Sequence, residues 1–478
     1  MKHCKKLAAI ASALLVLGFT ACSSDGDGGS GSGSDDSIQT GIPATGKPTG
    51  TTPTTPTTDT TPTTGTKPGQ TTPTTPASTA TTPGTPTTAR TPSASVLVKP
   101  TYKTVYGVTE DTYMKKIDEI IARLNANDPS QPKEFEFLFT GSKPITYDKF
   151  YTDNTGDSAN GFKERIRVLY FSHQDVRIGL DFTFVNVEDA FITGQWMFED
   201  GQNYKSIVFP RAKTDGLKLG EKFFKNCNNL EYIKLPDNLG GFSYDGYNFT
   251  SDGSVELKIE IPSTVKEITA ETFYKSKNLT TVIFNEGLET IGNNAFASDS
   301  NLKTVKIPST LKAIGNYAFR ECTALTNINL NSGLEKISEN AFLECTSLET
   351  IELPSSLLSI GNYAFTHTKL KKVIIPESVD TMGTGIFWNC HELETVEIYA
   401  PIIGTDVLAI ADVKTLIIGE KVKEIGTGNF VSTLTSVVFK NPEGWKCDGV
   451  AVDAAILKDP AAAATYLKTN KDKVFTRQ

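Results

Sequence analysis

Residues 302–325 read LKTVKIPSTLKAIGNYAFRECTAL, and this stretch decides the fold. The same order of apolar residues returns about every 23 residues, led by a leucine in each unit. The leading positions are Leu279, Leu302, Leu325, Leu348, Leu370 and Leu393. A period of this size is typical of repeat arrays, in which each unit buries its apolar face against its neighbours. The period therefore predicts a solenoid.

Each unit alternates inward and outward residues before a proline. Val305 and Ile307 have strand spacing, Lys306 between them points outward, and Pro308 stops the strand. Stacked units therefore predict a parallel sheet with one short strand per turn. Gly315 is expected to permit a tight bend into a short helical turn.

Phenylalanine and cysteine recur at fixed positions after that glycine. The phenylalanines expected to form a stacked spine are Phe296, Phe319, Phe342 and Phe365. Four cysteines follow the phenylalanine position, namely Cys227, Cys322, Cys345 and Cys390. With Cys447 they are read as small buried apolar groups. A disulfide between Cys322 and Cys345 remains open, although an odd count argues against a disulfide framework.

Weaker copies of the unit flank the regular ones. In the copy that begins at Leu230, the Gly-, Tyr-, Asn- and Ser-rich segment 240–254 is read as an insertion that leaves the solenoid as a loop. Near the C-terminus, Asp459 and Pro460 have the N-cap acid and N1 proline of a helix. We expect this helix to cap the solenoid.

The stretch before the repeats has mixed charge and more aromatic residues. A helix is predicted from Thr109 to about Asn127, with an N-cap hydroxyl and acids in its first turn. Two strands are predicted by alternation, one on 134–139 and one on 165–170. We interpret this region as a small α+β cap that shields the first turn; the alternative is a separate ligand-binding domain.

The N-terminus has the parts of an export signal. Lys2, Lys5 and Lys6 precede an apolar run that is too short for a comfortable transmembrane helix. The sequence LGFTAC at 17–22 resembles a bacterial lipobox, which implies that Cys22 is acylated and anchors the mature chain. A plain signal-peptidase site after Ala21, giving a secreted soluble protein, is the alternative.

A Gly/Ser/Asp-rich and then Thr/Pro-rich stretch follows, and it contains too little apolar surface for a core. It predicts a disordered, semi-extended stalk. Hydrophobic residues make up 38% of the chain and the net charge is −8. Removal of residues 1–21 deletes three lysines and no acid, which changes −8 to −11. An acidic chain argues against nucleic acid as a partner.

The repeat unit Leu-x-x-Ile-x-Leu-Pro-x-x-Leu-x-x-Ile-Gly-x-x-Ala-Phe-x-x-Cys resembles the BspA-type, or treponemal-type, bacterial leucine-rich repeat over about residues 178–440. The resemblance implies a surface protein or lipoprotein of a host-associated bacterium. It also implies adhesion to matrix proteins such as fibronectin and fibrinogen, coaggregation, or host-cell attachment. It implies no catalytic residues and specifies no ligand.

The predicted organisation has five parts. They are a signal peptide (1–21), the lipidated Cys22 with a disordered Thr/Pro-rich linker (22–96), an α+β N-terminal cap region (97–177), a leucine-rich-repeat solenoid (178–442) and a C-terminal cap (443–478).

The sequence contains none of the common catalytic and metal-binding signatures. The chain has four histidines and no CxxC, HExxH, GxSxG or phosphate-loop motif. His367 and His391 lie in neighbouring units and are read as surface or turn residues. We therefore expect no cofactor, no metal and no small-molecule substrate.

The outward residue of each strand defines the candidate binding row. Its members are Ile283, Lys306, Glu352, Ile374, Glu397, Ile417 and Val438. Ile374, Ile417 and Val438 place apolar side chains on the surface, as at many protein contacts, unless the C-terminal cap covers them. Beside the row, a threonine ladder is expected from Thr281, Thr304, Thr350, Thr395 and Thr415.

Anchor, stalk and repeat together favour a cell-surface adhesin that binds host-matrix or bacterial surface proteins. The second reading is a periplasmic or envelope scaffold without a host ligand. A third, from a different class, is a hydrolase within residues 97–200.

Overall fold

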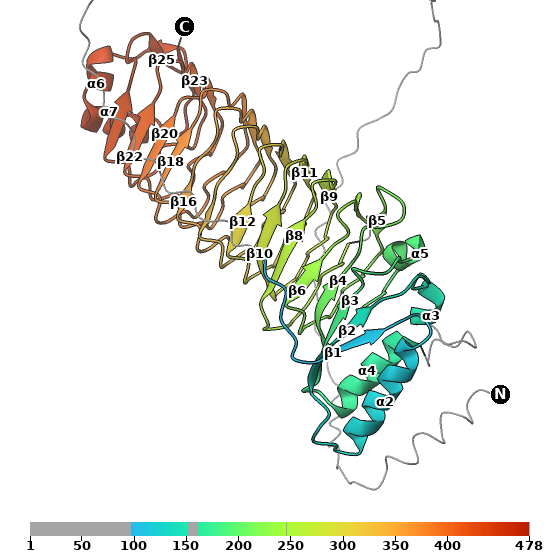
Figure 1. Ribbon diagram of the computed structural model, residues 1–478. Helices are drawn as coiled ribbons and strands as arrows, with labels where there is room; N and C mark the ends of the chain where they lie inside the picture. Colours follow the sequence, from blue (N-terminus) through green and yellow to red (C-terminus); the bar gives the residue numbers. More distant parts are fainter. Residues whose placement is uncertain (1–96, 152–160, 245, 478) are drawn as a thin grey trace, which may run out of the picture. The chain divides into compact units, whose positions relative to one another are not determined.

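Two sets of parallel strands run along the repeats and face each other across the core (Figure 1). The computed structural model describes residues 97–151, 161–244 and 246–477, and these belong to one unit of the chain. Successive turns stack into a parallel-sheet solenoid of about 11 turns. The predicted leucine-rich-repeat solenoid is therefore confirmed.

The first set carries one strand from each turn. Its first sheet has the order β1-β2-β3-β4-β6-β8-β10-β12, and shorter sheets β14-β16 and β18-β20-β22-β24 follow. The bounds are β1 (Val105–Val108), β2 (Glu134–Phe139), β3 (Arg177–Asp181), β4 (Tyr204–Val208), β6 (Tyr232–Lys234), β8 (Leu257–Ile261), β10 (Leu279–Phe284), β12 (Thr304–Lys306), β14 (Asn327–Ile328), β16 (Thr350–Ile351), β18 (Lys372–Ile375), β20 (Thr395–Ile398), β22 (Thr415–Ile418) and β24 (Ser436–Phe439). We call the outward side of these strands the strand face.

The second set was not predicted from the sequence. Its strands have two residues each, of which the second is buried in nearly every case, so the strand period holds even over this length. The bounds are β5 (Lys218–Leu219), β7 (Gly241–Phe242), β9 (Glu267–Ile268), β11 (Thr290–Ile291), β13 (Ala313–Ile314), β15 (Lys336–Ile337), β17 (Ser359–Ile360), β19 (Thr381–Met382), β21 (Ile402–Ile403) and β23 (Glu424–Ile425).

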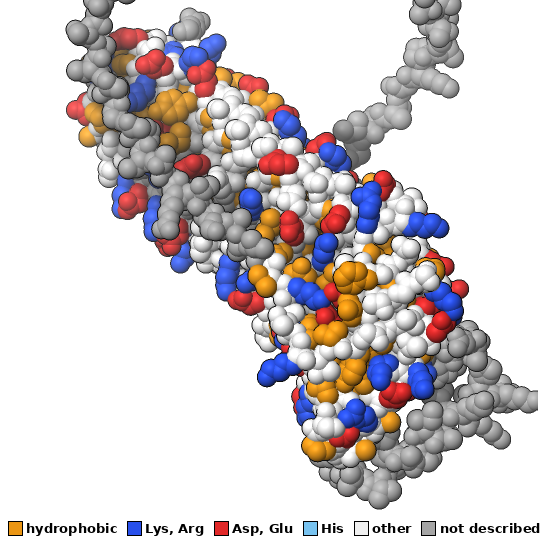
Figure 2. Space-filling model, viewed as in Figure 1, with side chains coloured by type: hydrophobic (Ala, Val, Ile, Leu, Met, Phe, Trp, Pro, Cys, Tyr) orange, Lys and Arg blue, Asp and Glu red, His pale blue; other side chains and the backbone are white. Residues whose placement is uncertain are grey.

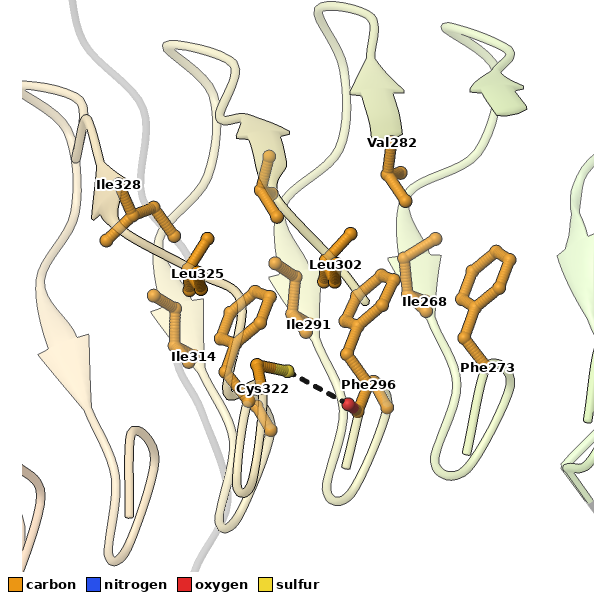
Figure 3. Close-up of a cluster of buried hydrophobic side chains, with 14 of the residues drawn as sticks. Ile268, Phe273, Val282, Ile291, Phe296, Leu302, Ile314, Cys322, Leu325 and Ile328 are labelled. Carbon is orange, nitrogen blue, oxygen red and sulfur yellow. Dashed lines mark hydrogen bonds between the residues drawn. The ribbon is translucent and has the colours of Figure 1, made fainter. Parts of the chain in front are cut away.

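A single turn of the solenoid has an entirely apolar interior. Leu302 and Ile314 are fully buried and point toward the same interior from opposite sides of the turn (Figure 3). Leu325, which opens the next turn, is also fully buried beside them. One such turn has neighbours on both sides, so its apolar surface is covered only when the turns stack.

The phenylalanines form one continuous stacked column through the core. Successive ring centroids lie 4.6 to 5.8 Å apart, and successive ring planes lie within 27° of each other. The members are Phe198, Phe224, Phe249, Phe273, Phe296, Phe319, Phe342, Phe365 and Phe387. The predicted spine is confirmed, and it is longer than the four rings named from the sequence.

Each phenylalanine lies in a non-helical reversal of the chain, not in the short helical turn that the sequence predicted. Tyr317 and Glu321 have φ of 55° and 59°, so the chain reverses through left-handed residues on both sides of Phe319. The amide of Phe319 donates to the carbonyl of Ala341 in the next turn, at 2.8 Å. In an α-helix this amide would donate to the carbonyl four residues earlier in the same segment. The observed geometry instead links neighbouring turns of the solenoid.

The glycine before the turn has a different role from the one predicted. Gly315 does not have a positive φ; a Cβ there would lie 2.7 Å from the carbonyl carbon of Gly292 in the preceding turn. The missing side chain therefore lets two backbones approach closely.

The segment 240–254 is not an external loop, so that prediction is wrong. Its strand β7 pairs with β5, and its Phe249 occupies the phenylalanine column between Phe224 and Phe273. Phe242 is also fully buried. Its many polar residues favoured an insertion, but the segment forms an ordinary turn of the solenoid with a few extra residues.

The N-terminal region continues the first sheet, with helices packed beside it at that end (Figure 1). The helices are α2 (Tyr113–Asn125), α3 (Tyr147–Tyr151), α4 (Phe162–Ser172) and α5 (Asp189–Thr193). The strand predicted on 134–139 is confirmed as β2. The strand predicted on 165–170 is wrong, because α4 covers it: Ile166 and Leu169 are buried at helical spacing while Val168 is 52% exposed.

The first of these helices starts later than predicted. Residues 109–112 form a turn, closed by a 2.9 Å bond from the amide of Thr112 to the carbonyl of Thr109. Thr112 is the N-cap residue of α2, and Glu110 is buried rather than displayed in a first helical turn.

The C-terminal end is closed by helices and by strands of opposite direction. Asp459 accepts hydrogen bonds from the amides of Ala461 and Ala462 and caps α7 (Pro460–Thr469), so the predicted helix is confirmed. α7 and the short α6 (Ala454–Lys458) pack against β24. Strand β27 (Phe475–Arg477) pairs antiparallel with β23 and with β25 (Trp445–Cys447), which pairs with β26 (Val450–Ala451).

Candidate functional site

The strand face displays the residues of the candidate binding row in register. Ile283 lies opposite Lys306, and a row of four continues along β18, β20, β22 and β24. The four are Ile374, Glu397, Ile417 and Val438. Glu352 is exposed directly after β16. Figure 2 shows charged side chains of both signs on this face of the molecule, with apolar side chains between them.

The four-residue row at the C-terminal end is the most apolar part of the candidate row. Ile374 is 44% exposed, whereas Ile417 and Val438 are half-buried. α7 and α6 lie against β24, so the cap lies next to Val438 and leaves Ile374 exposed. We call these four residues the apolar row.

Glu397 divides the apolar row and is fixed in place. Its carboxylate lies 2.7 Å from the ammonium of Lys372 and accepts a 2.9 Å hydrogen bond from the Tyr399 hydroxyl. The hydrogen bond from Lys372, with help from Tyr399, lowers the pKa of Glu397. Sequence reasoning missed Lys372 and Tyr399; Lys372 occupies the outward position two residues before Ile374, which is the signal that would have found it.

The threonines form two short runs rather than one ladder. Thr281 pairs with Thr304, and Thr395 pairs with Thr415. Between the runs, Thr350 pairs with an asparagine on β14. The polar edge beside the row is therefore mixed.

Residues suited to metal binding do not gather in the described part of the chain. Residues 97–151, 161–244 and 246–477 contain no group of three or more His, Cys, Asp or Glu side chains that would hold a metal ion. His367 is an exposed turn residue with φ of 58°. His391 is exposed as well, but its Nδ1 lies 3.3 Å from Asp412, a contact that the sequence spacing did not predict.

The buried cysteines form a hydrogen-bonded ladder beside the phenylalanine column. Each thiol donates to the carbonyl of the phenylalanine one turn back; Figure 3 shows the bond from Cys322 to Phe296, at 3.2 Å. Cys227, Cys345 and Cys390 repeat it at 3.0 to 3.1 Å. All these thiols are free, so Cys322 and Cys345 are not joined by a disulfide.

These thiols are expected to resist alkylation. Burial raises the pKa of Cys227 to about 12 and raises the pKa values of Cys322 and Cys345 as well, so the reactive thiolate is scarce at pH 8. We expect N-ethylmaleimide to leave them unlabelled in the folded protein and to label them in urea, as measured by peptide mass mapping. Equal labelling in both states would contradict the buried ladder.

The export and anchoring predictions concern other parts of the chain. The signal peptide, Cys22 and the Thr/Pro-rich linker lie outside the described residues. Among the helices that are described, none combines the length and the apolarity needed to cross a membrane.

Stacked parallel strands, a phenylalanine column and a fixed position for leucine in each turn define a leucine-rich-repeat solenoid. The sequence profile described as "BspA type Leucine rich repeat region (6 copies)" matches residues 245–345 and 312–436. Residues 245–436 of this chain are therefore leucine-rich repeats of the BspA type.

Solved structures of bacterial leucine-rich-repeat proteins are similar to the chain. A leucine-rich repeat protein from Bacteroides ovatus is 26% identical, with 51% of this chain and 68% of that chain covered and a TM-score of 0.39. A leucine rich cell surface protein from Faecalibacterium prausnitzii is 21% identical, with coverage of 48% and 68% and a TM-score of 0.32. The leucine rich repeat protein of T. pallidum is 25% identical, with coverage of 37% and 78% and a TM-score of 0.28. No curated protein matches the chain.

Proposed function

We propose that this chain is a cell-surface lipoprotein that binds other proteins through its strand face and serves as an adhesin for host-matrix or bacterial surface proteins. The apolar row is the observation that carries the proposal. Ile374 presents an exposed apolar side chain on a stacked sheet, and exposed apolar clusters on rigid elements favour protein contacts.

The surroundings of the row support a protein partner. Within the row, the carboxylate of Glu397 is already held by Lys372 and by the Tyr399 hydroxyl, so a partner need not satisfy this group itself. Protein interfaces commonly combine apolar side chains with hydrogen-bonded polar groups. Cys22, which we propose as the lipid anchor, and the linker after it are expected to hold this surface away from the membrane. The proposal includes no catalytic step.

Introducing charge into the apolar row is expected to abolish partner binding. In the double variant Ile374→Lys and Ile417→Lys, two ammonium groups replace the two isoleucine side chains on either side of Glu397, and their desolvation opposes association. We expect at least about a tenfold loss of affinity for any matrix protein that the unsubstituted chain captures, such as fibronectin or fibrinogen, by surface plasmon resonance. Circular dichroism and the melting temperature should stay unchanged.

Leu358→Lys is the matched control. Leu358 is 45% exposed, much like Ile374, but it directly precedes β17 of the second sheet. It should leave binding intact. Equal binding by the double variant would remove the apolar row from the proposal.

Location separates the adhesin from the envelope scaffold. Proteinase shaving of intact cells, with immunoblotting for the repeats and a periplasmic protein as the integrity control, should remove the repeats. Their survival would favour a scaffold inside the envelope.

A further inference from the structure

One segment of the chain crosses the strand face at its N-terminal end. Residues 97–104, which we call the strap, run from beside β8 to the start of β1 (Figure 1). The strap forms no strand, and the amide of Glu136 donates to the carbonyl of Thr104 only at its end, at 3.0 Å. The rest of the strap is therefore held mainly by its side chains.

The first anchor of the strap is a lysine above two acids. Lys99 forms ion pairs with Glu136 on β2, at 2.6 Å, and with Asp181 on β3. Glu136 and Asp181 are only 6% and 7% exposed, although both point outward from the strand face. Two carboxylates shielded from water repel each other, so this pair selects for a cation.

The second anchor is Tyr102, whose ring occupies the space left by the missing side chain of Gly179, which we call the glycine socket. The ring of Tyr102 lies over Gly179 so closely that a Cβ at this position would be 2.6 Å from Cζ of the ring. The hydroxyl of Tyr102 shares a 2.8 Å hydrogen bond with Ser206 on β4. Glycine weakens a strand interior and often marks the close approach of another group. Here the group is an aromatic side chain.

The surface continues beyond the strap. A hollow of about 190 Å³ opens beside Leu97 and is lined by Tyr232 on β6, Glu260 on β8 and Asn285 directly after β10. Tyr232 is half-buried and Glu260 is exposed. The hollow gives a peptide longer than the strap a place to continue on the strand face.

We propose that the strand face of β2, β3 and β4 is a peptide-binding groove which the strap occupies in cis. Its partner in trans is an extended peptide that presents a lysine and, three positions later, a tyrosine. The acid pair and the glycine socket recognise these two side chains whichever chain carries them. This groove is separate from the apolar row and does not depend on it.

Tethering explains why the strap is the resident occupant. The strap leads directly into β1, and a segment joined by so short a connection competes at an effective concentration on the order of millimolar. A free peptide at micromolar concentration is therefore excluded until the strap is loosened.

The test uses the full chain and a fluorescent peptide with the sequence of residues 97–104, LVKPTYKT. We expect the Lys99→Ala, Tyr102→Ala variant to bind it at least about tenfold more tightly than the unsubstituted chain, by fluorescence anisotropy. Lys103→Ala is the matched control, because Lys103 is an exposed lysine on the same strap. This variant should bind no better than the unsubstituted chain.

A single variant and a substituted peptide test the same groove. Tyr102→Ala alone retains the Lys99 ion pairs and serves if the double variant does not fold. A peptide with alanine at the positions of Lys99 and Tyr102, with the sequence LVAPTAKT, should not bind. A folded, strap-loosened variant that fails to bind LVKPTYKT, or an unsubstituted chain that binds it equally well, would overturn the proposal.

Discussion

Replacing Phe319 with alanine is expected to lower the free energy of unfolding by ~3–5 kcal/mol, the range typical of deleting a buried aromatic ring. The side chain is fully buried, and its ring lies between those of Phe296 and Phe342, at 5.2 and 5.3 Å. Neither neighbouring ring can fill the gap without leaving its own partner. Each turn contacts only its neighbours, so the loss should be concentrated around this turn.

Urea unfolding followed by circular dichroism measures the size of this effect, and hydrogen exchange measures its location. Phe171→Ala is the matched control, because Phe171 is 69% exposed on α4 and its loss should change stability by less than about 0.5 kcal/mol. Similar losses in the two variants would mean that the column does not carry the stability assigned to it.

Asp299→Cys is expected to stabilise the protein at neutral pH by about 1–3 kcal/mol, the usual penalty for a buried group that lacks a hydrogen bond. Asp299 follows Phe296 by three residues and so stands where other turns have the ladder cysteine. The carboxyl is fully buried; Oδ1 accepts the amide of Ser276 at 2.7 Å, whereas Oδ2 has no hydrogen-bond partner.

The stabilisation expected from Asp299→Cys depends on pH, because the carboxyl of Asp299 titrates. Burial raises the pKa of Asp299 well above its usual value, so on raising the pH the folded state keeps this proton after the unfolded state has released it. Stability is therefore fully present below the unfolded-state pKa, about 3.9, and falls as the pH rises from there toward the folded-state pKa. The advantage of Asp299→Cys should be smallest at acidic pH and grow toward neutral pH.

Asp299→Asn separates ionisation from hydrogen bonding. The amide keeps the shape of the carboxyl but cannot ionise, so this variant should lose the pH slope without restoring the thiol ladder. Urea midpoints measured between pH 3 and pH 8 test all three proteins. A slope unchanged in both variants would show that Asp299 is not the titrating group.

The sequence predicted those parts of the fold that depend on contacts between equivalent positions. Leu302, Phe319 and Cys322 have counterparts in neighbouring turns, so their burial and stacking follow from the period alone. The placement of the candidate row on one face followed in the same way, since every strand repeats the alternation seen around Lys306.

Non-repeated segments were predicted less well, for physical reasons. In α4, the alternation of Ile166, Val168 and Tyr170 with the residues between them arises by chance, and the helical spacing of the buried positions becomes visible only when Phe162 and Leu169 are included. In segment 240–254 most residues are polar, yet the two buried rings of Phe242 and Phe249 place this turn in the core.

The contacts of the strap could not be predicted because their partners lie far apart in the sequence. Lys99 and Asp181 are 82 positions apart, and Tyr102 meets Ser206 across 104 positions. Neither pair belongs to the repeat, so no local pattern connects its members. Glycine at position 179, inside a strand, was the only signal in the sequence for a group lying above the sheet.

The closed C-terminal end has a consequence for crowded copies of this protein. Strand β27 runs opposite to the repeats, and α6 and α7 lie against β24, so a second molecule does not find a free parallel edge there to extend. Solenoids that stack end to end grow into filaments, because each added copy presents the same edge to the next. Neighbouring copies should therefore not add to the parallel sheets through this end of the molecule.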